Sequence, residues 1–121
     1  MMHHFYETRP CGMLMGEQEG SIIALLQLNP TVGDIAGNAQ RLERFIRTAA
    51  ASGAVASVST ELAICGYPPR DLLMQSNFVE IAQQAVWGLD VEIPSLIGTP
   101  TTPDHDRGKP VSYTHLTLPT R

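Results

Sequence analysis

Three short apolar runs separated by helix-like patterns constrain this chain more than any other feature. The runs cover residues 22–28, 54–59 and 95–98, and turn-forming residues follow each of them. Between the first two runs, apolar residues recur at three- and four-residue intervals, as on one face of an α-helix. Strand, helix and strand in this order predict a parallel sheet with helices outside it. We therefore expect an α/β fold, with the first strand buried on both faces.

Two amphipathic helices are expected between the runs. The first follows Asn38, a residue type that caps helix N-termini, and ends before Gly53, which suits the position after a helix. The second follows Ser76 as its cap, and Trp87 lies off its apolar stripe, where we expect it to cover a seam. Asp71 begins an additional short helix, because a negative charge suits a helix N-terminus.

Composition limits the class of protein. The chain has 121 residues, enough for one domain, and 43% of them are apolar, which favours a globular fold. A net charge of −4 without a block of lysine or arginine argues against nucleic acid and anionic membranes as partners. No apolar run approaches the roughly 20 residues of a membrane span. Two cysteines make no disulfide framework, so a cytoplasmic, reducing compartment is expected.

The candidate site follows the second apolar run. Glu61 stands at the end of this run, and a turn at Gly66, Tyr67 and two prolines follow. A carboxylate at a strand end is where α/β proteins build sites, because the sheet fixes the backbone and the loop supplies the pocket. A solvated glutamate is the simpler interpretation from spacing alone, since most charged side chains lie at protein surfaces.

Two blocks of the sequence resemble one family. Residues 61–73, ELAICGYPPRDLL, resemble the glutamate motif of the nitrilase, or carbon–nitrogen hydrolase, superfamily, and in particular the glutaminase domain of glutamine-dependent NAD synthetases. Residues 23–38, IALLQLNPTVGDIAGN, resemble the opening strand and first helix start of that domain. The resemblance covers about residues 21–100. It implies the first part of a nitrilase-type α-β-β-α sandwich, here incomplete.

The resemblance also implies a chemistry. In that family a cysteine attacks the glutamine side-chain amide, a glutamate takes the thiol proton, and a lysine stabilises the oxyanion. Glu61 matches the catalytic glutamate, and Tyr67 matches a tyrosine that lines the glutamine pocket. Nothing here matches the cysteine or the lysine. Cys65 is expected to be a small apolar filler, and Lys109 comes too early in the chain.

One departure from the family stands beside the candidate base. Ser59 and Thr60 occupy the positions where most members have an aromatic residue and a proline. Proline helps to set the strand exit because its φ is fixed. Threonine is compatible with a strand, so we expect the fold to survive and the placement of Glu61 to be less well fixed.

The resemblance implies partners for a longer enzyme. Glutamine is the substrate, and the ammonia passes to a synthetase domain that amidates deamido-NAD with ATP and Mg²⁺, in a homo-oligomer. For this chain we predict no cofactor or metal site, and no activity, because a base without its nucleophile has no covalent route. A stand-alone nitrilase-type amidase, a non-catalytic binding module and a truncation without function remain as alternatives.

The two ends are expected to lie outside this domain. Residues 1–20 show no period and are predicted to be a disordered leader, and residues 21–110 form the partial domain. Residues 111–121, VSYTHLTLPTR, resemble one reading frame of a sequencing-library adapter and are predicted to be a non-native tail. The adjacent histidines 3 and 4, and the Asp-His-Asp run at 104–106, lack the spacing of metal ligands.

Overall fold

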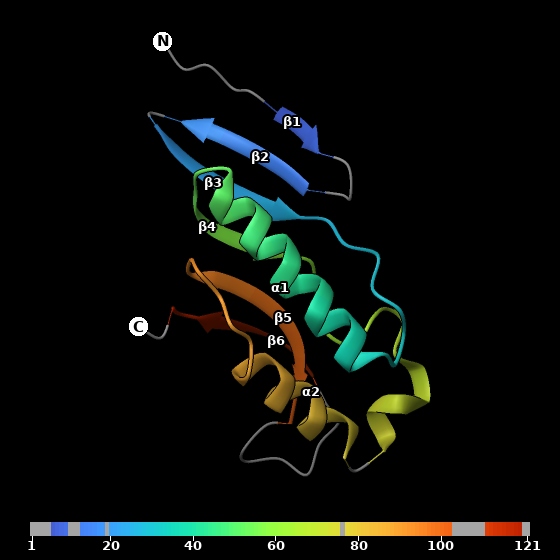
Figure 1. The fold of residues 1–121 in the computed structure, drawn as a ribbon. Coiled ribbons are helices and arrows are strands. Elements are labelled where there is room, and N and C mark those ends of the chain that lie inside the picture. Colours follow the sequence, from blue (N-terminus) through green and yellow to red (C-terminus); the bar gives the residue numbers. More distant parts are fainter. Residues whose placement is uncertain (1–5, 10–12, 19, 76, 103–110, 120–121) are drawn as a thin grey trace.

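One mixed sheet organises the described part of the chain. The computed structural model describes residues 6–9, 13–18, 20–75, 77–102 and 111–119. Within these ranges, six strands form a sheet whose spatial order follows the sequence (Figure 1). The strands are β1 (Tyr6–Arg9), β2 (Met13–Gln18), β3 (Ser21–Leu26), β4 (Ala54–Ser59), β5 (Ser95–Thr101) and β6 (Val111–Thr117). β3, β4 and β5 are parallel, and the other pairs are antiparallel. The predicted α/β fold with a parallel centre is confirmed.

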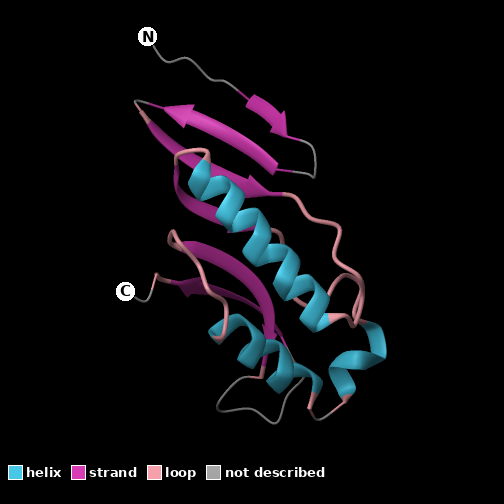
Figure 2. Cartoon of the chain, in the orientation of Figure 1, coloured by secondary structure: helices cyan, strands magenta, loops and turns pink. Residues whose placement is uncertain are grey.

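Helices connect the parallel strands. α1 (Ile35–Ala51) joins β3 to β4, and the 3₁₀ helix η1 (Arg70–Met74) and α2 (Phe78–Trp87) lie between β4 and β5. Asp71 lies in the first turn of η1, as predicted. Both α-helices cover the same face of the sheet (Figure 2). This follows from connectivity, because both crossovers run in the same direction from β3 to β4 to β5, and right-handed crossovers in one direction place their helices on one face.

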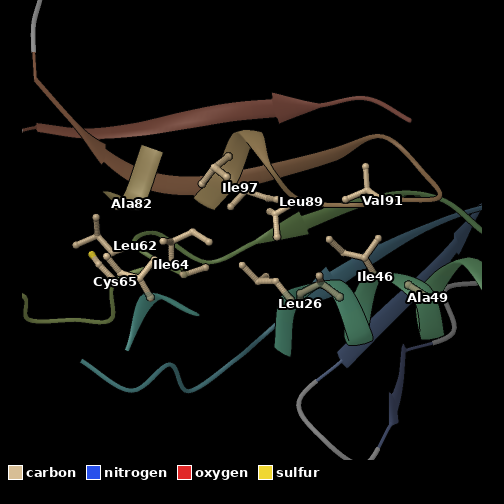
Figure 3. Packing of buried hydrophobic residues seen from close by; sticks show 14 of the residues in the cluster. Leu26, Ile46, Ala49, Leu62, Ile64, Cys65, Ala82, Leu89, Val91 and Ile97 are labelled. Atoms are coloured by element: carbon tan, nitrogen blue, oxygen red, sulfur yellow. The ribbon is translucent and has the colours of Figure 1, made fainter. Parts of the chain in front are cut away.

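The core lies between the helices and the sheet (Figure 3). Leu42, Ile46 and Ala49 of α1 are fully buried, so the predicted apolar face of this helix is confirmed. The prediction for α2 is only partly right. Ile81, expected on its buried stripe, is 50% exposed, and Trp87 is 66% exposed rather than covering a seam. α2 is therefore rotated from the expected orientation.

Among the described side chains, apolar ones are exposed on the opposite face of the sheet. A row of paired residues crosses four strands on this face: Leu25, Val58, Leu96 and Leu116. The three leucines of the row are between 38% and 52% exposed, whereas Ala24 and Leu26, which point toward the helices, are buried. The prediction that the first strand is buried on both faces is therefore wrong. β3 alternates between a packed face and an open apolar face.

Strands also occupy the described parts of both ends. β2 pairs antiparallel with β3, from Met13 opposite Leu26 to Gln18 opposite Ser21, and β1 pairs with β2. Residues 6–9 and 13–18 of the predicted disordered leader are therefore strands in the structure, and the division of the chain into leader, domain and tail stays a prediction. β6 falls within residues 111–121, whose non-native origin stays a prediction.

Candidate functional site

Glu61 lies at the carboxyl end of β4. The strand ends at Ser59, and Glu61 begins the turn that follows it. β4 lies between two parallel neighbours, β3 and β5, and ligands of α/β proteins bind beyond the carboxyl ends of such strands. The side chain of Glu61 is exposed. A solvent-accessible carboxylate therefore lies at the carboxyl end of a central strand, where sequence analysis expected it.

The backbone around Glu61 is tightly constrained by β5. Leu62 has a φ of +55°, in the left-handed region that residues with a Cβ rarely adopt. A Cβ on Gly98 of β5 would lie 2.6 Å from the carbonyl oxygen of Thr60 and 2.8 Å from the Cα of Glu61. Only glycine allows β5 to approach the bend so closely. Sequence analysis did not identify Gly98, because it is distant in sequence from the turn that it contacts.

Asn38 of α1 holds the turn after β4 by hydrogen bonds. It is 1% exposed, and its Nδ2 donates to the carbonyl oxygens of Thr31 and Ile64, both at 2.8 Å. Its Oδ1 accepts from the N–H of Thr31 at 2.9 Å. The prediction of Asn38 as a helix cap is wrong. Asp34 caps α1, with its Oδ1 accepting from the N–H of Gly37 at 3.1 Å, and Asn38 is turned inward.

The rest of the turn belongs to the core. Leu62, Ile64 and Cys65 lie together at one end of the buried cluster (Figure 3). Cys65 has no exposed surface, and burial raises the pKa of its thiol from 9.0 to about 11. Its carbonyl oxygen accepts from the N–H of Gly33 at 2.9 Å. Cys65 is therefore a protonated packing residue at neutral pH, which confirms the prediction of an apolar filler.

Tyr67 lies on the loop that leaves this turn. Its side chain is 75% exposed. It follows Gly66, whose φ is +81° and where a Cβ would lie 2.8 Å from the Cα of Val32. The glycine lets the loop at residues 31–34 pack directly against the turn. The structure thus brings Tyr67 and Glu61, the two predicted site residues, onto one braced loop, with both side chains exposed.

Metal and membrane sites were also sought in the described ranges. There, no group of three or more histidine, cysteine, aspartate or glutamate residues is placed to hold a metal ion. Residues 3, 4 and 104–106, together with Cys11 and Lys109, lie outside the described residues. None of the helices that the structure describes has both the length and the apolar character needed to cross a membrane.

Comparison with known proteins identifies the family. The profile of the family described as carbon-nitrogen hydrolase matches residues 22–102. This range includes Glu61, Tyr67, and the residues Asn38 and Gly98 that contact the turn between them. The chain belongs to the carbon–nitrogen hydrolase family. A glutamine-dependent NAD(+) synthetase from Synechocystis sp. is 45% identical over 87 residues, which cover 69% of this chain and 15% of that protein. Another, from Thermotoga maritima, is 40% identical over 57 residues, which cover 47% and 10%.

The fold has counterparts among solved structures. The glutamine-dependent NAD+ synthetase from Acinetobacter baumannii superposes with a TM-score of 0.70 and 24% identity, over 79% of this chain and 18% of that one. At this identity the likeness shows the fold alone. The described sheet, with helices on one face and an apolar face left open, is therefore part of a nitrilase-type sandwich. This member of the carbon–nitrogen hydrolase family spans only 10% to 15% of the length of the two curated relatives above.

Proposed function

We propose that this chain forms the first part of the glutamine amidohydrolase of a glutamine-dependent NAD synthetase. The observation that carries the proposal is the 45% identity over 87 residues to the Synechocystis synthetase. A general carbon–nitrogen hydrolase fold would be compatible with many amide substrates. The relatedness to synthetases favours the side-chain amide of glutamine as the substrate and ammonia as the product that the complete enzyme uses to amidate deamido-NAD.

In this proposal Glu61 is the general base. Its carboxylate takes the proton of a cysteine thiol, and the thiolate attacks the glutamine amide carbon. Glu61 passes that proton to the amide nitrogen, so the C–N bond breaks, ammonia leaves and a thioester remains. Glu61 then activates the water that releases glutamate. A general base needs to lie within about 3 Å of the atom that carries the proton it accepts, so a fixed backbone is an advantage. The contacts of Gly98 with the bend around Glu61 support this role.

The nucleophile is not Cys65. Its side chain has no exposed surface on which a substrate could be attacked, and burial raises the pKa of its thiol to about 11. The proposal therefore takes the attacking cysteine, and the lysine that stabilises the oxyanion, from outside the described residues. By itself the 121-residue chain is expected to release no ammonia from glutamine.

Tyr67 is the proposed substrate contact. Its exposed ring and hydroxyl are free to line a glutamine pocket, and the neighbouring Gly66 turn fixes where the loop begins. ATP, Mg²⁺ and deamido-NAD belong, in this proposal, to a separate synthetase domain. None of them is assigned to a residue of this chain.

A segment exchange tests the proposal. Residues 22–102 replace the matching segment of the Synechocystis synthetase, and ammonia release from glutamine is measured. Added ammonium salt supplies the synthetase reaction independently, so its rate reports whether the hybrid enzyme is folded. We expect glutamine-dependent ammonia release from the hybrid and none from the isolated chain. A hybrid that uses ammonium but not glutamine would refute the proposal.

A further inference from the structure

The regular pairing between β4 and β5 ends just before Glu61. The pairing between β4 and β5 runs through Val58 opposite Leu96. Beyond this point, the N–H of Gly98 donates instead to the side-chain Oγ of Ser59, at 3.1 Å. A side-chain hydroxyl thus continues the connection between the strands, next to the proposed base.

The hydroxyl of Ser59 acts in two directions. It accepts the bond from Gly98 and donates to the carbonyl oxygen of Thr60 at 3.1 Å. That same carbonyl oxygen is the atom closest to where a Cβ of Gly98 would lie, at 2.6 Å, and the Cα of Glu61 and the N of Leu62 follow at 2.8 Å. Backbone atoms of residues 60–62 therefore lie against Gly98. Ser59 bonds to both partners of this contact, the N–H of Gly98 and the carbonyl oxygen of Thr60.

We propose that Ser59 is a positioning residue for Glu61, acting through this contact with Gly98. The inference rests on the proposed function, in which Glu61 is the base. Sequence analysis expected a less well fixed Glu61 because no proline precedes it. In this chain the serine hydroxyl, rather than a fixed φ, restrains the strand exit. Misplacing a reacting group by about 1 Å can lower a rate by about 100-fold, so such a restraint bears on catalysis.

The first test uses the unaltered 121-residue chain. Amide order parameters measured by NMR are expected to be as high for Glu61 and Leu62 as for the residues of β4. Amide hydrogen exchange at Gly98 is expected to be slow, because its N–H is bonded. If the amides of Glu61 and Leu62 are less ordered than those of β4, the proposal is overturned without any variant.

Variants then separate positioning from mere stability. Ser59→Ala removes both bonds, whereas Ser59→Thr keeps a hydroxyl that can accept and donate. We expect Ser59→Ala to speed exchange at Gly98 at least about 10-fold, and to shift and broaden the ¹³C resonance of the Glu61 carboxylate. Ser59→Thr is expected to restore both signals. Ser52→Ala, which removes a hydroxyl bonded to Thr48 at the far end of α1, is the matched control and should change neither.

The outcomes are distinguishable from failure of the proposed function. Faster exchange at Gly98 with an unchanged Glu61 carboxylate signal would show that Ser59 only satisfies a backbone donor, and would overturn the proposal. None of these signals requires turnover. An inactive hybrid enzyme would therefore refute the glutaminase assignment while the Ser59 measurements still report whether Glu61 is held.

Discussion

The side-chain amide of Asn38 donates a 2.8 Å hydrogen bond to the carbonyl oxygen of Ile64, 26 residues further along the chain. The same side chain makes two bonds to the backbone of Thr31. One buried residue of α1 therefore joins the loop after β3 to the turn that carries Glu61. The bond to Ile64 is buried and the two bonds to Thr31 are partly buried, so removing the side chain leaves the buried carbonyl oxygen of Ile64 without this partner.

Asn38→Ala is expected to lower the free energy of unfolding by about 2 to 4 kcal/mol, since one buried and two partly buried hydrogen bonds are lost. Urea denaturation of the 121-residue chain measures this. Gln40→Ala is the matched control, because Gln40 lies on the same helix and is exposed. It should change stability by less than about 0.5 kcal/mol. Equal effects of the two substitutions would contradict the bracing role.

Gly98→Ala is expected to destabilise the chain by about 1 to 3 kcal/mol, because the added methyl would meet backbone atoms that cannot rotate away. Gly88→Ala is the control. A Cβ there would lie 3.4 Å from its nearest neighbour, the carbonyl oxygen of Gln84, and φ is −85°. Chemical denaturation should show little change for Gly88→Ala. An unchanged free energy of unfolding for Gly98→Ala would mean that β5 does not contact the turn closely.

Local patterns predicted the parts of this fold that local chemistry decides. The buried stripe of α1 at Leu42, Ile46 and Ala49 follows from helical periodicity, and the parallel centre follows from the order of strands and helices. Glu61 was placed at a strand end because an apolar run precedes it. These features depend on residues that are close in sequence.

The features that sequence missed depend on distant partners. Asp34 and Asn38 are both helix-capping types, and the hydrogen bonds of Asn38 to Thr31 and to the distant Ile64 hold its side chain inward. Leu25 is apolar but exposed, because a sequence shows which residues are apolar and not whether a layer covers them. The hydrogen bond between Ser59 and Gly98 could not be predicted, because the two residues are 39 positions apart.

The stability of the chain should fall as pH rises from 9 to about 11, the window between the ordinary pKa of Cys65 and its raised value. Below pH 9 both states keep the thiol proton. Within the window the unfolded chain ionises while the folded chain does not, so ionisation favours unfolding, by about 2 to 3 kcal/mol in total. Cys65→Ala should lack this component when urea denaturation is compared across pH. Identical pH profiles would contradict the burial of the thiol.

The open face of the sheet should promote self-association. Leu25 and Leu96 are 42% and 38% exposed and lie in one row of that face. Replacing both by threonine is expected to lower light scattering of concentrated solutions, because exposed apolar patches associate and threonine is compatible with strands. As a control, Ile81→Thr removes a comparably exposed apolar side chain from α2, outside that row. Scattering that falls equally with Ile81→Thr would argue against a specific role of the open face.

The most direct test of the central claim is the glutamine-dependent ammonia release of the hybrid synthetase carrying Glu61→Gln, which preserves size and removes the base. We expect kcat to fall by about 100- to 10,000-fold while synthesis from added ammonium is unchanged. Glu80→Gln, at an exposed position of α2, should leave both rates unaltered. Ammonia release that survives Glu61→Gln at the rate of the Glu80→Gln control would contradict the account.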